Sequence, residues 1–388
     1  MVKAVLGGDK AAVAASNAAF SNAGIGRTGT YLALDYLIQQ AQAENSVDIF
    51  SCVSQMRQER VNMVQTVDQY ILLHDALTVW YIADDTTTSI TNYPQIYNQL
   101  LQQDKHNNTS QLQHKYQLMN KISCKIDKDG YSEALKPENI NKNRDQNVLA
   151  ANSARLMIMR SAYENSSDYI NAVYLPILSF RFGPQSYKKK RGYIATQTPL
   201  PNTVEDFWLM VLNSETKVII ALDDKKENNV GEYIPKTEIK YGEVMIKRGK
   251  EDKNSHGYYD VISCEISQES DNINRTVKVY QCHFWKGQKK IPESSMSIFT
   301  LLEEISSINN SGPLIVSCLN GANKSGLLCV LAAILERLTI EQDVSIIQTI
   351  LQLRISRPEI INSFEQFQFS FGAIEEYLDN FSNYANSC

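Results

Sequence analysis

The segment of residues 312–338, GPLIVSCLNGANKSGLLCVLAAILERL, holds the side chains best suited to covalent chemistry. Cys318 ends an apolar run, Gly321 and Gly326 lie in the polar stretch that follows, and Lys324 comes six residues after the cysteine. A thiolate becomes a good nucleophile where backbone N–H groups and a helix N-terminus lower its pKa. The same N–H groups bind phosphate oxygens. The segment therefore predicts a phosphate cradle with a thiol nucleophile at its base.

A buried strand and an amphipathic or core helix must position this loop. Residues 313–318 are a short apolar run typical of a strand, and the run Leu327–Leu335 is typical of a core helix. The same patterns predict further strands and helices, so we expect an α/β (α+β) fold with a central mixed sheet flanked by helices. The expected strands are 168–178, 192–198, 217–222, 241–247, 258–266 and 276–285, and the expected helices are 204–213, 294–307, 325–338, 342–355 and 364–383. Asn202 and Glu205 form a capping-box pattern at the start of the first of these helices.

The composition excludes several classes of protein. The 388 residues are 43% hydrophobic and 21% charged with a net charge of −5, which does not favour nucleic-acid binding. The seven cysteines form no CxxC pair and no zinc-ligand spacing, so neither a disulfide framework nor a metal or other cofactor is indicated. No apolar run approaches the roughly 20 residues that span a bilayer. A reducing, cytoplasmic setting is the expectation.

The loop sequence occurs twice in the chain. Residues 22–38, NAGIGRTGTYLALDYLI, align with residues 319–335, LNGANKSGLLCVLAAIL, at an offset of 297. The offset holds without a gap further along, where Arg57 aligns with Arg354. A match that keeps register over some 50 residues predicts an internal repeat.

The repeat predicts two domains of unequal completeness. Residues 1–85 are expected to be the C-terminal remnant of a first domain, and residues 88–384 a complete second copy. In the remnant, helices are expected at 28–42, 47–60 and 67–83, the last one capped by Thr66 and Gln69.

The segment NAGIGRTGTY (22–31) resembles the signature loop of the protein tyrosine phosphatases, in which a His-Cys pair is usually followed by SAGxGRTG. Other segments resemble blocks of that family in the family's order: KNR (142–144), DYINAVY (168–174), GYIATQTPLPNTVEDFWLMV (192–211) and RPEIINSFEQF (357–367). The chain is identified as a member of the receptor-type group, in which tandem domains are typical. The resemblance implies that the membrane-distal domain is catalytically weak or inactive.

The resemblance also implies roles for individual residues. Cys318 stands at the position of the nucleophile that forms a phosphocysteine, and Gln366 keeps a second glutamine of the family pattern. The phosphate-binding loop would consist of Leu319, Asn320, Gly321, Ala322, Asn323, Lys324 and Ser325.

Several positions of the second copy depart from the family pattern. Lys324 replaces an arginine that grips phosphate with a planar fork. The loop that normally carries the general acid reads WKGQKKIP (285–292), so Gly287 or Gln288 stands where the aspartate should be. Asp145 replaces a tyrosine that stacks on the substrate ring, and Asn362 replaces the water-positioning glutamine.

The first copy departs in the opposite way, because it keeps Arg27 but has Ser21 at the nucleophile position.

Losing a general acid costs about 10²–10⁴ in rate. We therefore expect the cytoplasmic part of a receptor-type tyrosine phosphatase whose complete domain is an inactive, regulatory pseudophosphatase. Its expected partners are phosphotyrosine proteins or another phosphatase domain. An active phosphotyrosine hydrolase is the alternative, and a purely structural remnant is a third.

Overall fold

The computed structural model describes residues 25–83, 87–103, 109–123, 125–160, 167–175, 192–222, 229–254, 256–268, 273–308 and 312–385. Ser21 lies outside these residues. Among the helices within the described ranges, none is both long enough and apolar enough to cross a membrane.

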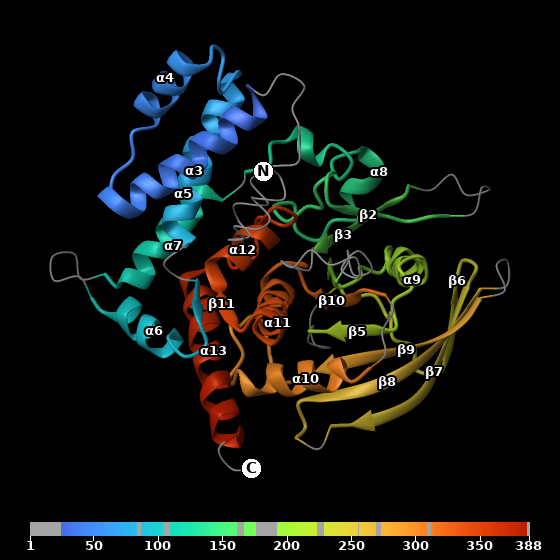
Figure 1. The fold of residues 1–388 in the computed structure, drawn as a ribbon. Helices are drawn as coiled ribbons and strands as arrows, with labels where there is room; N and C mark the ends of the chain where they lie inside the picture. Colours follow the sequence, from blue (N-terminus) through green and yellow to red (C-terminus); the bar gives the residue numbers. More distant parts are fainter. Residues whose placement is uncertain are drawn as a thin grey trace.

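A nine-stranded mixed sheet forms the centre of the fold (Figure 1), as the apolar runs predict. Its strand order is β2-β3-β4-β10-β5-β9-β8-β7-β6. The four strands from β4 to β9 in this order run parallel, and the flanking strands pair antiparallel. The strands are β2 (Arg155–Met157), β3 (Tyr169–Leu175), β4 (Tyr193–Gln197), β5 (Val218–Ala221), β6 (Glu238–Tyr241), β7 (Val244–Lys253), β8 (Tyr259–Gln268), β9 (Ile273–Cys282) and β10 (Leu314–Cys318).

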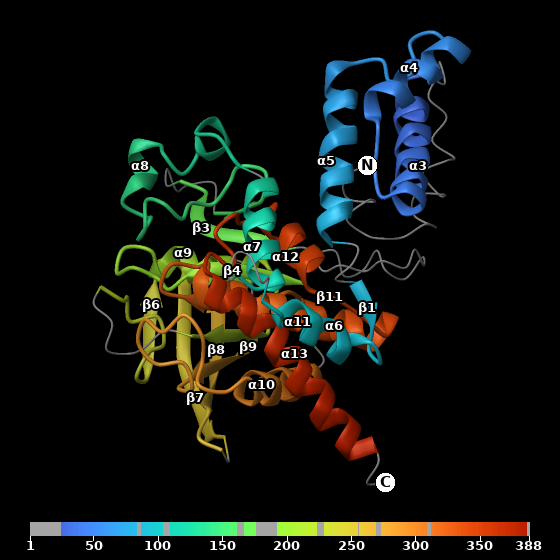
Figure 2. The same cartoon turned by 90° about the vertical axis from the view of Figure 1, so that its left-hand side faces the viewer.

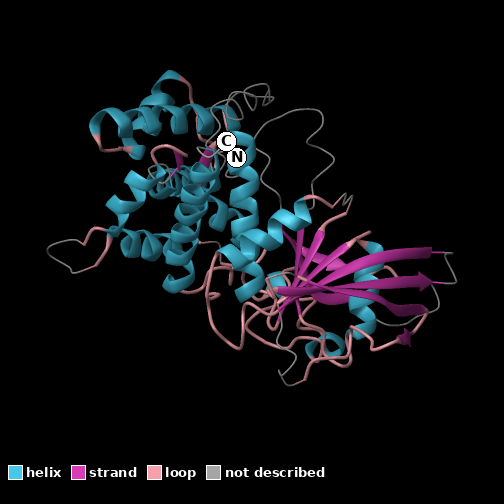
Figure 3. Cartoon of the chain, turned by 90° about the horizontal axis from the view of Figure 1, so that it is seen from below, coloured by secondary structure: helices cyan, strands magenta, loops and turns pink. Residues whose placement is uncertain are grey.

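Helices cover both faces of this sheet, and strand alternation decides which side chains meet them (Figure 3). In β10, Val316 belongs to the apolar cluster of the helices α10–α13, whereas Ile315 belongs to the cluster around α9. The helices are α9 (Val204–Asn213), α10 (Met296–Ser306), α11 (Asn323–Glu341), α12 (Ile346–Arg354) and α13 (Phe364–Ala385).

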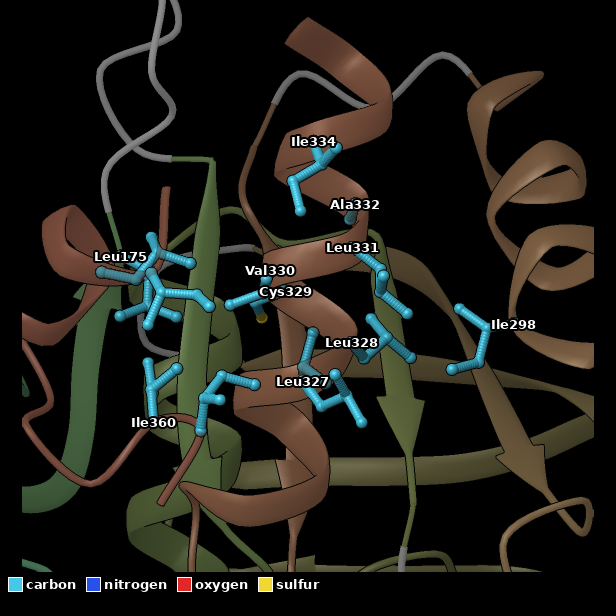
Figure 4. Close-up of a cluster of buried hydrophobic side chains, with 14 of the residues drawn as sticks. Leu175, Ile298, Leu327, Leu328, Cys329, Val330, Leu331, Ala332, Ile334 and Ile360 are labelled. Carbon is cyan, nitrogen blue, oxygen red and sulfur yellow. The ribbon is translucent and has the colours of Figure 1, made fainter. Parts of the chain in front are cut away.

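Helix α11 is the core helix that the run Leu327–Leu335 predicts. Its side chains from Leu327 to Ile334 are buried, and Figure 4 shows several of them packed between β3 and α10 residues such as Leu175 and Ile298. A helix that is apolar nearly all round is expected to be buried on all sides.

Shorter elements lie among the longer helices and strands after residue 86. These are β1 (Thr87–Ser89), α6 (Tyr93–Leu101), α7 (Gln111–Ile122), η3 (Asp129–Tyr131), α8 (Pro137–Ile140) and β11 (Asp343–Ser345). β1 pairs antiparallel with β11, and the hydroxyls of Thr87 and Ser345 lie 2.7 Å apart.

Three N-terminal helices form a unit with its own small core (Figure 2). They are α3 (Arg27–Glu44), α4 (Ile49–Glu59) and α5 (Val67–Ala83), close to the expected boundaries. The capping box of α5 is present, because Gln69 N donates to Thr66 Oγ1 and Thr66 N donates to Gln69 Oε1. Residues such as Phe50 and Val61 on this unit are more than 70% exposed.

The two repeated segments share backbone details at the offset of 297. Val64 and Ile361 both have positive φ, 56° and 55°. Arg57 donates to the carbonyl of Val64 at 2.7 Å, and Arg354 donates to the carbonyl of Ile361 at 2.6 Å. A β-branched residue with positive φ is uncommon. Its occurrence at both aligned positions therefore supports the internal repeat.

Two local predictions are wrong. The expected strand 241–247 is a hairpin, because the chain turns at Gly242, whose φ is +56°, between β6 and β7. Asn202 does not cap α9, whose N-cap residue is Thr203 and has no side-chain cap. The Asn202 amide instead donates to the carbonyl of Asn141 at 3.2 Å.

Candidate active site

The predicted cradle lies at the carboxyl end of β10, between that strand and the first turn of α11. Parallel neighbours β4 and β5 flank β10, and Cys318 is in register with Gln197 of β4. The cysteine side chain is 1% exposed. A nucleophile at this edge of a parallel sheet, next to a helix N-terminus, is well placed to meet an anion.

Gly321 allows the loop to lie directly against β4. Its φ is +72°, and a Cβ atom there would come within 2.5 Å of the Gln197 backbone nitrogen. The residue therefore has to be glycine for conformational and steric reasons. Gly321 N also donates to Cys318 O at 3.1 Å, which closes the turn after the strand.

The thiol of Cys318 is next to the first turn of α11. Its sulfur lies 3.1 Å from Ser325 Oγ, which is itself fully buried. The structure thus brings together the two ends of the loop that the sequence assigned to phosphate binding.

The Asn320 side chain lies inside this loop. Its Oδ1 atom accepts hydrogen bonds from the backbone nitrogens of Ala322 and Asn323, both at 3.1 Å. The same atom lies 3.7 Å from Cys318 Sγ. The sequence identified Asn320 only as a loop residue. The contact was not predicted, although an asparagine where the family signature has alanine was a visible signal.

Lys324 connects the cradle to the loop at 285–292. Its buried ammonium donates to the carbonyl oxygens of Trp285 at 2.8 Å and Leu222 at 3.3 Å. These two bonds hold the charge against backbone carbonyls rather than in a planar fork.

The segment 285–292 carries no carboxylate. Trp285 anchors it, because this side chain is 3% exposed and its Nε1 donates to Lys289 O at 2.9 Å. Glu293 follows the segment and pairs with the Lys289 ammonium at 2.9 Å. The hydrogen bond from Lys289 lowers the pKa of Glu293, which makes it a poorer proton donor.

The glutamine and asparagine near the cradle hold backbone and side chains in place. Gln366 Nε2 donates to the carbonyls of Asn323 at 3.2 Å and Lys290 at 3.0 Å. Asn362 Nδ2 donates to Asn323 Oδ1 at 3.0 Å. Both predicted positions therefore lie beside the loop.

Two other segments that contact the elements around the cradle carry acidic residues, Asp145 and Glu359. Gln197 Oε1 accepts from the Arg144 backbone nitrogen at 3.0 Å, whereas the carboxylate of the next residue, Asp145, accepts from Asn147 N at 2.9 Å. Burial raises the pKa of the Glu359 carboxyl, and the charge of Asp145 contributes to the same shift. Sequence reasoning missed Glu359, since a glutamate in a polar segment gives no signal of its own.

The remaining predicted position lies elsewhere. Arg27 is exposed at the start of α3, in the N-terminal helical unit, and Ser21 lies outside the described residues. The structure therefore does not describe the loop of the first copy as a site.

Comparisons with known proteins identify the family. The protein-tyrosine phosphatase family model matches residues 15–79 and 139–376. Human receptor-type tyrosine-protein phosphatase alpha is 28% identical over 371 residues, which cover 94% of this chain and 45% of that protein. Chicken receptor-type tyrosine-protein phosphatase U is 30% identical over 375 residues, covering 92% of this chain and 25% of that protein.

Human receptor-type tyrosine-protein phosphatase epsilon is 26% identical over 377 residues, covering 94% of this chain and 52% of that protein. The chain thus spans about half or less of the length of these relatives. The matches to the family model and to these relatives lead to one conclusion: the chain belongs to the protein-tyrosine phosphatase family and resembles its receptor-type members.

Proposed function

We propose that this chain is a cytoplasmic part of a receptor-type tyrosine phosphatase, and that its complete domain regulates or binds partners rather than hydrolysing phosphotyrosine. The observation that carries the proposal is the lack of a carboxylate in residues 285–292. A tyrosinate leaving group has a pKa near 10 and needs a proton as it departs. Losing the general acid costs about 10²–10⁴ in rate.

The neighbouring acid does not replace the missing one. Glu293 is exposed, pairs with Lys289, and has a lowered pKa. A general acid works best when its pKa lies near the working pH, so a lowered carboxyl pKa is a change in the wrong direction.

Lys324 also weakens the binding of the phosphate group. A lysine presents a point charge where an arginine presents two parallel N–H donors to a phosphate. Its ammonium already donates to the carbonyls of Trp285 and Leu222. Removing one preorganised oxyanion donor costs about 10²–10³ in rate, although losses within one site need not multiply.

The proposal includes two phosphatase copies of unequal completeness, 1–85 and 88–384. The shared positive φ of Val64 and Ile361 supports it, as do the equivalent hydrogen bonds of Arg57 and Arg354. The partners we propose are phosphotyrosine proteins or another phosphatase domain, because the cradle's fold is retained while its proton donor is not.

An active phosphatase is the competing function, and the buried Cys318 beside Ser325 favours it. An assay of the full chain with two substrates, p-nitrophenyl phosphate and a phosphotyrosine peptide, distinguishes the two functions. p-Nitrophenolate leaves without a proton, so it reports on the cradle alone, whereas the peptide also requires the acid. We expect no peptide turnover above that of Cys318→Ser. Peptide turnover that Cys318→Ser abolishes would establish the competing function.

A further inference from the structure

We propose that the Asn320 side chain occupies the phosphate position of the cradle, so that the loop satisfies its own N–H groups and excludes oxyanions. The inference rests on the proposed function and deepens it. An inactive cradle that keeps its fold can still bind phosphate, but the position of Asn320 indicates that this one does not. Of the two proposed kinds of partner, the inference therefore favours another phosphatase domain over phosphotyrosine proteins.

The first step concerns the hydrogen-bond donors. A phosphate in such a loop is held by backbone N–H groups that converge on it. The N–H groups of Ala322 and Asn323 instead donate to Asn320 Oδ1, each at 3.1 Å. Each backbone N–H carries one proton, so a phosphate oxygen can use these donors only after the amide oxygen has moved away.

The second step concerns space above the nucleophile. Asn320 Oδ1 lies 3.7 Å from Cys318 Sγ. A reacting phosphorus atom would have to lie roughly 3–3.5 Å from that sulfur in a productive complex. The amide oxygen and an incoming phosphate therefore compete for the same volume.

The third step concerns the support for this arrangement. Gln366 and Asn362 hold Asn323 from outside the loop, through its carbonyl and its side-chain oxygen respectively. Of the two residues whose N–H groups Asn320 uses, Asn323 is thus held in place by side chains other than Asn320. An acceptor tethered to the loop also competes at a high effective concentration with a free anion.

The fourth step is that the loop does not require this side chain in order to form. The first copy has Ala23 at the equivalent position, and the family signature also has alanine there. Alanine has no acceptor, so an alanine loop keeps its N–H groups available.

The test measures oxyanion binding by the full chain and its Asn320 variants. Orthovanadate and tungstate are titrated while the melting temperature is followed, since a ligand that binds the folded state raises it. We expect no rise for the wild type at about 1 mM anion, and at least about tenfold tighter binding for Asn320→Ala. Asn320→Asp is the matched control, because it keeps the acceptor oxygen and adds a negative charge. It should bind no anion.

Asn320→Ser is the second variant, whose hydroxyl accepts from these N–H groups more weakly than the amide oxygen does, so it should bind anion with intermediate affinity. Wild-type-like anion affinity in folded Asn320→Ala and Asn320→Ser would overturn the inference. Failure of both variants to fold would also overturn it, because the side chain would then be structurally required. The peptide turnover of Asn320→Ala should stay at background, since the acid is still missing. Turnover by the wild type would instead refute the proposed function, so the two failures are distinguishable.

Discussion

Replacing Gly321 by alanine should destabilise the protein through two separable effects. The left-handed conformation, with φ at +72°, costs a non-glycine residue roughly 1–2 kcal/mol. The new Cβ would also lie 2.5 Å from Gln197 N and 2.7 Å from the carbonyl carbon of Thr196. Both atoms are backbone, so relief requires the loop or β4 to shift, at about 1–3 kcal/mol. The total is about 2–5 kcal/mol.

Gly287→Ala is the matched control for this prediction. Its φ is +57°, but no atom lies within 4 Å of the position of its Cβ, so only the conformational cost of about 1–2 kcal/mol applies. Thermal melts of both variants should show the larger fall in melting temperature for Gly321→Ala, by about 1.5 °C for each kcal/mol of difference in a unit of about 300 residues. Equal melting temperatures would refute the close approach of the cradle to β4.

Three further predictions follow from buried contacts. Arg354→Lys should lower the free energy of unfolding, measured in urea, by about 2–4 kcal/mol, because a single ammonium cannot replace the bonds of the guanidinium to Ile361 O and Ser123 Oγ. A smaller loss of stability than in Arg57→Lys, at the less buried equivalent site, would contradict this. Deleting residues 1–85 should leave a chain that still melts cooperatively, since most buried side chains of the N-terminal helices form a separate cluster and only the end of α5, at Ile82, joins the main core. A melt without a cooperative transition would show that residues 88–384 need the preceding helices to fold. Burial raises the pKa of the Cys264 thiol to about 11, so the thiol stays neutral at pH 8. Iodoacetamide should therefore label Cys264 only in urea, as read by mass spectrometry. Rapid labelling of Cys264 in the folded protein would contradict this prediction.

The order of strands and helices could be predicted because apolar runs and repeat register are local signals. The run 313–318 is β10 of the sheet, and Leu327–Leu335 lies in a helix buried on all sides. The helices of the first copy were equally predictable, since the same pattern recurs at an offset of 297.

The details that depend on contacts between segments were not predictable. The capping pattern at Asn202 failed because its amide bonds to Asn141, some 60 positions earlier in the chain. The hairpin at Gly242 divided an apolar run that looked continuous. The contacts of Asn320 depend on the geometry of the loop, and a sequence pattern does not show whether a side chain points into a loop or away from it.

The central claim, that the domain keeps a cradle without its chemistry, is tested most directly by the covalent intermediate. The full chain is mixed with a ³²P-labelled phosphotyrosine peptide and quenched in acid within milliseconds to minutes, with Cys318→Ser as the control. Any active member of the family must form a phosphocysteine, whatever its later rate. We predict no protein-bound label above that of Cys318→Ser at any time. Label that maps to Cys318, and that decays as free phosphate is released, would contradict the claim.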